Sequence, residues 1–243
     1  MPDHSIELSV IIPVFNEEAD ILDNLRAVEK KLNAMGIAYE IIVVNDGSTD
    51  QTLSKVRTYS SDHTIVLSYG KNQGKGFAVR HGMLHAAGKY KIFMDIDLST
   101  SLEAFELFLA RMREDKCDMI IGDRKSNPDN QTVKQPFYRR FLGRGFTRLS
   151  CWCIGRDIKD FTCGFKIFNK KAAEIVFQRQ KVYRWAFDTE LIYIALLHGL
   201  RIDEMPVIWE HHQISAVRPL RDIMTSLSGL FQIKFNEWTG QYR

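Results

Sequence analysis

Leu8 to Asn16 reads LSVIIPVFN and Tyr39 to Asp46 reads YEIIVVND, two apolar runs that each end in polar side chains. Between them, apolar residues recur at helical spacing from Ile21 to Met35, and Gly36 follows at the position of a helix C-cap. A buried strand, an amphipathic helix and a second buried strand make up the repeating unit of a parallel sheet. This stretch therefore predicts an α/β fold.

The same alternation continues along the chain. Further strands are expected at 63–69, 89–97 and 119–122, and further helices are expected to begin near residues 49, 76 and 100. Thr100 and Glu103 have the spacing of a capping box at the start of the last of these helices. We predict a Rossmann-like, mostly parallel central sheet that is flanked by helices.

After residue 122 the alternation breaks. Asp123 to Asp160 is polar and basic without a clean period, which predicts either a long functional loop or a pair of short surface helices. Strands are then expected at 163–168 and 202–209, and helices at 170–177, 187–197 and 219–238. Because no linker or internal repeat interrupts the chain, we predict a single domain over residues 1–243.

Composition excludes several classes of protein. Of the 243 residues 45% are hydrophobic, enough for a sizeable core, and the net charge of +3 does not require a nucleic-acid partner. We find no apolar run of the roughly 18 residues that span a bilayer, and no signal peptide. The four cysteines form no CxxC pair, so we expect reduced thiols and a cytoplasmic protein.

Polar residues gather where the predicted strands end, which is where open α/β sheets bind their ligands. Asn16 and Glu17 follow the first strand, Asp46 and Gly47 follow the second, and Asp95-Ile96-Asp97 ends the fourth. Taken alone, NDGSTD (45–50) is also typical of a turn and a helix N-cap. The clusters together favour a binding site.

Asp95 and Asp97 are candidate metal ligands. Alternation along an extended segment places both carboxylates on one side, where they can hold a hard divalent cation. Two carboxylates at the end of an apolar strand would repel each other without a cation or a cationic partner. The pattern favours Mg²⁺ or Mn²⁺ together with a diphosphate.

Other motifs are weaker. The glycine-rich run from Gly70 to Gly76 lacks the spacing of a phosphate-binding P-loop, although Lys75 and Arg80 could approach an anionic ligand. His81 and His85 lack the glutamate of a zinc-protease motif and are expected to be a packed or solvated pair. The chain contains no GxSxG motif, so nucleophilic catalysis by a serine has no support.

Seven motifs in order carry a family resemblance: SVIIPVFNE, VVNDGSTD, NQGKGFAVRHG, DIDLS, GDR, DFTCGFKIF and FDTELI. They resemble the inverting glycosyltransferases of family 2, which have a GT-A fold, and are most similar to the polyprenyl- and dolichyl-phosphate glucosyl- and mannosyltransferases. The resemblance extends from about Leu8 to Trp209. It implies a nucleotide-sugar-binding and metal-binding half at 8–122 and an acceptor-binding half at 123–218, followed by the amphipathic helix 219–238.

For the donor side, the resemblance implies that Glu17 lies near the ribose and that Asp46 binds the base. It implies that Asp95 and Asp97 bind the metal, with Asp97 the more direct ligand. Ser99 stands where some relatives carry a glutamine ligand, which leaves the third protein contact open. The full set implied for the nucleotide sugar is Pro13, Val14, Asn16, Glu17, Asp46, Gly47, Lys75, Arg80, Asp95, Ile96 and Asp97.

For the acceptor side, Gly122-Asp123-Arg124 matches a motif usually written Gly-Ser-Arg, so Asp123 is a departure and Arg124 is the first candidate for the acceptor phosphate. A basic segment without acids follows, as either a solvated helix face or a surface for phosphate and anionic lipid. Its cations are Lys134, Arg139, Arg140, Arg144 and Arg148. The acceptor-phosphate ligands expected are Arg124, Arg139, Arg140, Arg144 and Asp160.

Asp188 and Glu190 in FDTE resemble the place of the catalytic base in relatives with hydroxyl acceptors. A phosphate acceptor, with a second pKa of about 6, is already mostly ionised and needs no strong base. We therefore assign Asp188 and Glu190 to acceptor positioning, while Asp188 could instead cap its helix. The catalytic set expected is Asp95, Asp97, Arg124, Asp188 and Glu190.

The activity expected is metal-dependent transfer of glucose or mannose, from UDP-glucose or GDP-mannose, to a polyprenyl phosphate on the cytosolic face of a membrane. A saccharide or other hydroxyl acceptor is the alternative, and an inactive binding module is a third hypothesis. The terminal helix carries an apolar stripe that packs on its own domain, the favoured interpretation, or lies on the bilayer or a separate membrane subunit or flippase. The stripe comprises Leu220, Ile223, Met224, Leu227, Phe231, Phe235 and Trp238.

Overall fold

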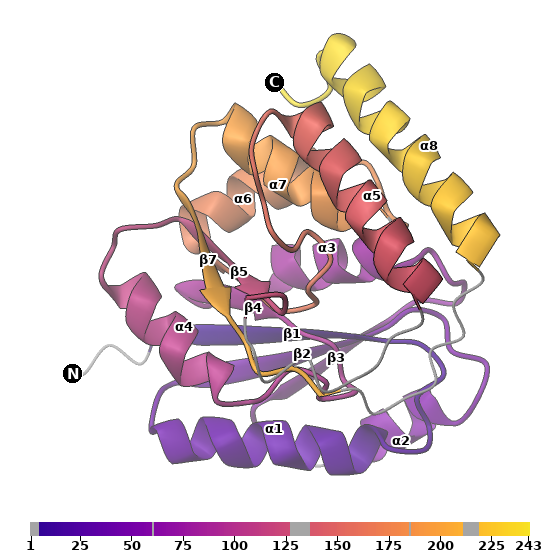
Figure 1. Ribbon diagram of the computed structural model, residues 1–243. Coiled ribbons are helices and arrows are strands. Elements are labelled where there is room, and N and C mark those ends of the chain that lie inside the picture. The colour runs from indigo at the N-terminus through magenta and orange to yellow at the C-terminus, as the bar shows by residue number, and fades with distance from the viewer. Residues whose placement is uncertain (1–4, 60, 127–136, 185, 211–218) are drawn as a thin grey trace.

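The computed structural model describes residues 5–59, 61–126, 137–184, 186–210 and 219–243, with the backbone alone for 137–144, 146 and 219–227. Within these residues a seven-stranded sheet has the order β3-β2-β1-β4-β6-β5-β7 (Figure 1). Its strands are β1 (Leu8–Val14), β2 (Tyr39–Asn45), β3 (Thr64–Ser68), β4 (Tyr90–Phe93), β5 (Met119–Asp123), β6 (Lys166–Asn169) and β7 (Ile202–Pro206). All of them run parallel except β6, so the predicted mostly parallel sheet is confirmed.

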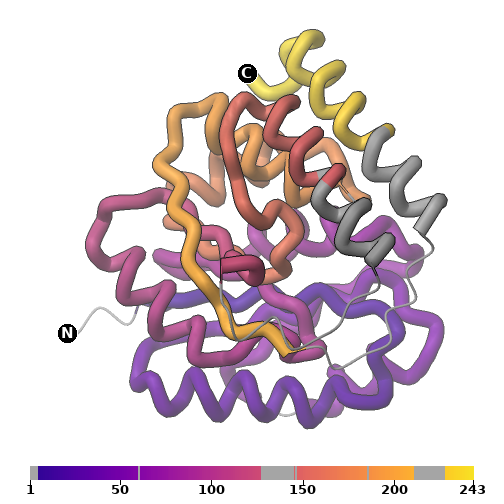
Figure 2. The backbone as a smooth tube through the Cα atoms, in the orientation of Figure 1, coloured from indigo at the N-terminus to yellow at the C-terminus, as the bar shows by residue number. Residues whose placement is uncertain are grey.

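Helices cover both faces of the sheet (Figure 1). One face packs against α1 and α4, and the other packs against α3, α6 and α7, with two separate apolar clusters between the layers. Figure 2 shows the early residues on one side of the molecule and the later helices on the other, with α5 beside α8. The helices are α1 (Ile21–Met35), α2 (Thr52–Thr58), α3 (Lys75–His85), α4 (Ala104–Arg113), α5 (Phe137–Ile154), α6 (Lys170–Arg179), α7 (Phe187–Leu197) and α8 (Pro219–Trp238).

Strand register brings distant loops to one edge. Val14 is paired with Asn45, and Asn45 with Ser68, so the loops after β1, β2 and β3 begin side by side. The antiparallel strand β6 pairs Lys166 with Phe93, the last residue of β4. The residues before Lys166 therefore meet the residues after Phe93 at this same edge.

The fourth strand is shorter than predicted. It ends at Phe93, and Asp95 and Asp97 lie in the irregular segment that follows, with Leu98 at a φ of 54°. The prediction that strand alternation places both carboxylates on one side is therefore wrong, because neither residue is in the strand. The predicted capping box is also wrong, because α4 begins at Ala104 and its N-cap residue Glu103 makes no capping side-chain hydrogen bond.

The region after residue 122 contains the helix α5 (Phe137–Ile154), 18 residues long, in place of the predicted long loop or pair of short helices. Leu149, Cys151 and Ile154 near its end pack against the core cluster on the α3, α6 and α7 face. The helix is therefore stabilised by tertiary contacts, which local periodicity did not reveal.

The terminal helix has its predicted bounds, but the favoured interpretation of its stripe is wrong for the residues that the structure describes. Leu230 and Ile233 are buried, whereas Phe231 is 75% exposed and Trp238 83% exposed. Phe235 on the same stripe is also exposed. The side chains of Leu220, Ile223, Met224 and Leu227 lie outside the described residues.

The structure also bears on the membrane-span and cysteine predictions. In the part of the chain that the structure describes, no helix combines the length and the apolar character needed to cross a bilayer. All four cysteines are free: Cys117 and Cys163 are buried, and Cys151 and Cys153 are half-buried.

Candidate active site

The loops after β1 and β2 are joined by hydrogen bonds. The Asn16 N–H donates to Ser48 Oγ at 3.0 Å, and Asn16 Oδ1 accepts from the Thr49 N–H at 2.8 Å. The Glu17 N–H donates to Thr52 Oγ1 at 2.8 Å. Asn16 has a φ of 57°, a value that asparagine tolerates better than most residues. The NDGSTD segment is thus a loop whose hydrogen bonds position Glu17. Its alternative interpretation as a helix N-cap is wrong, because the N-cap residue of α2 is Gln51, which makes no capping side-chain hydrogen bond.

Glu17 lies in the field of the two predicted metal ligands. Burial raises the pKa of its carboxyl group, and the negative charges of Asp97 and Asp95 raise it further. Such coupling requires the three carboxyl groups to lie near one another. This agrees with the pairing of β1 with β4, because Glu17 and the two aspartates follow the ends of these neighbouring strands.

Asp46 is buried and holds the glycine-rich loop. Its Oδ1 accepts from the Gln73 N–H at 2.7 Å, and its Oδ2 accepts from Asn72 Nδ2 and from the Gly74 N–H, each at 2.9 Å. Gly47 has a φ of 69°, and a Cβ there would lie 2.6 Å from the Asn72 nitrogen. In this structure the carboxylate predicted to bind the base instead anchors the loop that leads to α3.

Lys75, the first residue of α3, forms an ion pair with Asp95 Oδ1. The two side chains are 39% and 42% exposed, so the pair is open to an approaching ligand. Burial alone would lower the pKa of Lys75, but the charges of Asp95 and Asp188 outweigh it and raise the pKa. The glycine-rich loop therefore places one cation on the first acid of the DxD motif.

Gly164 packs directly against Asp95. A Cβ at this position would lie 2.1 Å from Asp95 Oδ2, a separation that no side chain can occupy. The contact follows from register, because Lys166 pairs with Phe93 across antiparallel strands and each residue lies two positions away from that pair. The glycine of the DFTCGF motif therefore shapes the DxD site.

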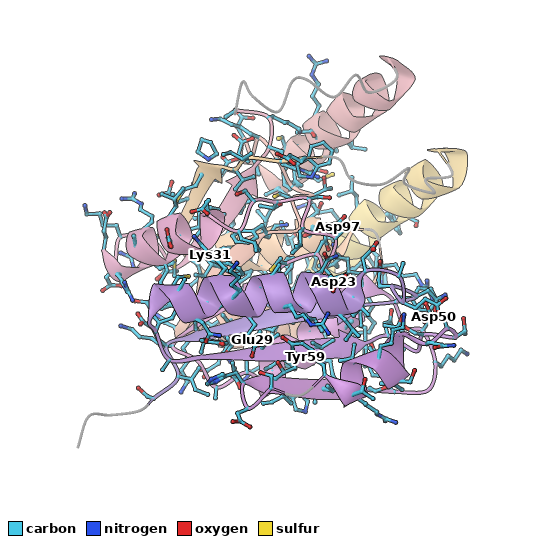
Figure 3. The ribbon with its side chains drawn as sticks, turned by 90° about the horizontal axis from the view of Figure 1, so that it is seen from below. Asp23, Glu29, Lys31, Asp50, Tyr59 and Asp97 are labelled. Carbon is cyan, nitrogen blue, oxygen red and sulfur yellow. The ribbon has the colours of Figure 1, made fainter. Side chains whose placement is uncertain are left out.

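The donor set fits a magnesium or manganese ion that is completed by substrate. Asp95 and Asp97 supply carboxylates, and Asp97 Oδ1 also accepts from the Ser99 N–H at 3.0 Å. Among the residues that the structure describes, no three His, Cys, Asp or Glu side chains are grouped as a metal site. Mg²⁺ commonly binds one or two carboxylates plus phosphates and waters. Figure 3 shows Asp97 near the end of α1 that carries Asp23, away from Lys31.

Arg124 and Asp160, both predicted to bind the acceptor phosphate, bind each other. Arg124 Nε donates to Asp160 Oδ2 at 2.7 Å, and Nη2 donates to Oδ1 at 2.8 Å and to Thr162 Oγ1 at 2.9 Å. The Arg124 guanidinium also lies over the Trp209 ring at 5.8 Å. Asp160 is 1% exposed, so it orients Arg124 and is not itself open to a phosphate.

Asp123, the departure from the Gly-Ser-Arg motif, is buried and turned toward its own loop. Its Oδ1 accepts from the Lys125 N–H at 2.8 Å and from the Ser126 N–H at 3.2 Å. The acid therefore shapes the turn after β5. Of the predicted basic segment, Arg148 is exposed on α5, while Lys134 and the side chains of Arg139, Arg140 and Arg144 lie outside the described residues.

Asp188 does not cap α7, whose N-cap residue is Ala186. Asp188 Oδ1 instead accepts from Lys166 Nζ at 2.5 Å, and Lys166 is completely buried. Lys166 Nζ also donates to the Cys163 carbonyl at 2.6 Å. A buried ammonium is tolerated only when it is paired, so Asp188 serves as its counter-ion.

Glu190 is completely buried, and its carboxylate is occupied. It accepts from the Val182 N–H at 2.8 Å, from the Lys181 N–H at 3.1 Å and from the Tyr242 hydroxyl at 2.6 Å. Burial raises the pKa of Glu190, and these hydrogen bonds oppose the rise. The position argues against the predicted role in acceptor positioning, because the carboxylate joins a loop and the C-terminal segment to α7.

Several predicted donor residues face elsewhere. Arg80 Nε donates to the Phe177 carbonyl at 2.8 Å and so joins α3 to α6, away from the strand ends. Val14 and Ile96 are buried in the apolar cluster beneath α1 and α4, so neither side chain faces a ligand. Pro13 is half-buried near the end of β1.

The histidine pair is packed, as expected. The His81 and His85 rings lie 4.4 Å apart, and His81 also contacts the Tyr69 and Phe77 rings.

Two residues of the site escaped sequence reasoning. Gly164 and Lys166 both lie in DFTCGFKIF, where the motif drew attention only to Asp160. A lysine within an otherwise apolar strand is a signal for a buried ion pair, because an unpaired buried charge is costly. The contact between Gly164 and Asp95 had no local signal, since it depends on an antiparallel strand.

Comparison with known sequences gives a consistent match. Residues 9–177 match the family described as Glycosyl transferase family 2. The dolichyl-phosphate beta-glucosyltransferases of Drosophila melanogaster and Homo sapiens are 35% and 34% identical to the chain. Each alignment covers 98% of this chain and 78% of the relative.

Solved structures match over almost the whole chain. Glucosyl-3-phosphoglycerate synthase from Mycobacterium tuberculosis, in complex with Mn²⁺, UDP and glucosyl-3-phosphoglycerate, has a TM-score of 0.64 at 16% identity, covering 94% of this chain and 80% of that one. Mannosyl-3-phosphoglycerate synthase from Rubrobacter xylanophilus has a TM-score of 0.66 at 15% identity, covering 97% and 75%. At such low identity the likeness concerns the fold alone.

Proposed function

The chain belongs to glycosyl transferase family 2, and from this premise we propose that it transfers glucose from a nucleotide-diphosphate sugar to dolichyl phosphate or a related polyprenyl phosphate. Its GT-A fold agrees with the fold that the seven motifs predicted. Relatives named for this reaction cover 98% of the chain, which favours glucose over mannose. UDP-glucose is the first donor that we propose to test.

The choice of a phosphate acceptor rests on one observation: both acids that resemble the place of the catalytic base are occupied. Asp188 is bound to Lys166, and Glu190 is bound to two backbone N–H groups and the Tyr242 hydroxyl. Neither is free to remove a proton from an acceptor hydroxyl. A lipid phosphate is already mostly ionised at neutral pH and needs no such base.

The residues of the chain divide the work in this proposal. Asp95 and Asp97 would hold Mg²⁺ or Mn²⁺, which supplies positive charge to offset the charge that develops on the departing diphosphate. Asp46 fixes the loop at 72–74, so Lys75 begins its helix beside Asp95. Arg124, oriented by Asp160, is the residue that we propose for the acceptor phosphate, because guanidinium groups bind phosphate well.

Contact with a membrane surface is part of the proposal. Trp152 on α5 is 81% exposed and Trp238 on α8 is 83% exposed, and these two helices lie side by side (Figure 1). The helix α5 also contains four arginines and no acid. Aromatic side chains with arginines suit the interface of an anionic bilayer. We place the enzyme peripherally on the cytosolic face.

The test is transfer of radiolabelled glucose from UDP-glucose to dolichyl phosphate in detergent or liposomes with Mn²⁺ or Mg²⁺. The expected product is an organic-extractable, acid-labile glycolipid. GDP-mannose with dolichyl phosphate, and UDP-glucose with soluble saccharides, serve as comparison reactions. Label recovered only on a saccharide would overturn the phosphate acceptor, and label from GDP-mannose alone would overturn the donor.

A further inference from the structure

The backbone at Lys75 is held by close contacts on both sides. A Cβ on Gly74 would lie 2.5 Å from the Tyr183 carbonyl oxygen, and one on Gly76 would lie 2.6 Å from Phe187 Cβ. The Gly76 N–H donates to the Tyr183 carbonyl at 2.9 Å. Because these contacts fix the start of α3, the long side chain of Lys75 is the part that can change position.

Lys75 belongs to a row of alternating charges. It contacts Asp95, and the start of its helix packs against the start of α7 at Gly76 and Phe187, next to Asp188, which contacts the buried Lys166. The row crosses from the DxD loop to α7 and β6, joining the donor side of the site to the acceptor side. A lysine between two acids has an alternative partner if it leaves the first one.

We propose that Lys75 is the resident counter-ion of the metal site: it neutralises Asp95 when no divalent cation is bound and must leave Asp95 when one binds. This inference rests on the proposed function in one respect, namely that a divalent cation binds at Asp95 and Asp97. An ammonium group in contact with Asp95 Oδ1 competes with a divalent cation for that oxygen, and two adjacent cations repel each other.

Lys75 has two destinations once it is released. Asp188 already attracts it from the acceptor side, and the donor diphosphate, which accompanies the metal, brings anionic oxygens to the same place. When the metal ion replaces Lys75 at Asp95, the ammonium group of Lys75 therefore moves toward the diphosphate leaving group. In the enzyme without donor or metal, Lys75 therefore lowers the affinity for the metal ion. A lysine that only binds the ligand would not have this effect.

The experiment is calorimetric titration of Mn²⁺ alone into the wild-type protein, Lys75→Met and Lys71→Met. Lys71 is an exposed lysine in the same loop, so its replacement removes the same charge without touching Asp95. We expect Lys75→Met to bind Mn²⁺ about fivefold more tightly, equivalent to the roughly 1 kcal/mol of a partly exposed ion pair. Lys71→Met should stay within about twofold of the wild type, a smaller effect because surface charges are screened.

A second measurement separates this role from a structural one. Without metal, Lys75→Met should melt at a lower temperature because Asp95, Asp97 and Glu17 lose their cation, and Mn²⁺ should raise its melting temperature more than it raises that of the wild type. Unchanged or weaker Mn²⁺ binding by Lys75→Met would overturn the inference. If neither the wild type nor any variant binds Mn²⁺, even with UDP present, the assignment of Asp95 and Asp97 as metal ligands is wrong as well. The proposed glucosyl transfer is tested independently by the radiolabel assay.

Discussion

Arg124 and Asp160 lie 36 positions apart in the chain and are joined by three hydrogen bonds, two from the guanidinium group at 2.7 and 2.8 Å and one from the Arg124 backbone N–H at 3.3 Å. Sequence reasoning assigned both residues to the acceptor phosphate. The structure divides these roles, because the buried carboxylate orients the guanidinium and only Arg124 is partly exposed. The pair also joins the turn after β5 to the segment before β6.

Asp160→Asn should lower the free energy of unfolding at pH 7 by about 2 kcal/mol. Burial alone would raise the pKa of Asp160, but the Arg124 guanidinium outweighs it and lowers the pKa to about 2. Since the folded pKa lies below the unfolded one, this stability is present above about pH 4 and is lost as the pH falls toward 2.

Urea unfolding at pH 7, 5 and 3 measures this effect, and the gap between wild type and Asp160→Asn should narrow at pH 3. Asp23→Asn is the matched control, because Asp23 makes an exposed pair with Arg26. A gap that is independent of pH would contradict the role of the Asp160 charge.

Gly164→Ala should reduce turnover by about 100-fold, because the added methyl group displaces Asp95 and a shift of about 1 Å in a reacting site has a cost of this size. Gly70→Ala is the control, since a Cβ there meets nothing within 4 Å. Steady-state kinetics and a thermal melt of both variants check the prediction. Normal turnover by a folded Gly164→Ala protein would show that the position of Asp95 is not critical.

Asp97→Asn should reduce metal-dependent turnover by a factor on the order of 1,000 while the protein stays folded, because a metal ion contributes several kcal/mol of charge stabilisation. An asparagine oxygen can still accept from the Ser99 N–H, so the loop should persist. The readouts are turnover at saturating Mn²⁺ and the melting temperature. Wild-type activity in this variant would remove Asp97 from the metal site.

Tyr242→Phe should lower the free energy of unfolding by about 1 to 3 kcal/mol, because it deprives the buried Glu190 of a hydrogen-bond donor. If Glu190 is structural, kcat and KM remain near the wild-type values at a temperature where the variant is folded. Chemical denaturation, together with kinetics at a temperature below the measured melting transition of the variant, tests both parts. A large fall in kcat with unchanged stability would return Glu190 to the catalytic group.

The double substitution Trp152→Ala with Trp238→Ala should weaken binding to anionic vesicles by about tenfold. This is the effect expected when two tryptophan rings that are partly inserted into the bilayer interface are removed. Stability should hardly change, because both rings are exposed. Co-sedimentation with phosphatidylserine vesicles is the measurement, and Leu107→Ala, at an exposed position on α4, is the control. Equal binding by the double variant and the control would exclude this aromatic surface as the membrane contact.

Strands and helices with strong local periodicity were predictable. The helix Ile21–Met35 ends before Gly36, since burial on one face imposes a helical spacing of apolar residues. The strands β1 and β2 lie within their expected ranges, since strands buried on both faces read as continuous apolar runs. The helix Phe137–Ile154 was missed because its stability comes from packing rather than from a clean period.

The sequence by itself determined the order of elements, the family and the presence of acids at the strand ends, because each of these depends on residues that are neighbours in the chain. Only the tertiary structure decided which charges meet: Asp95 with Lys75 and Gly164, Asp188 with Lys166, Arg124 with Asp160. These contacts depend on sheet order and on the reversed strand β6, which brings the DFTCGF segment beside the DxD loop. Whether a charged side chain is available to a ligand or is paired within the protein depends on its neighbours in space, and those neighbours are residues distant in the sequence.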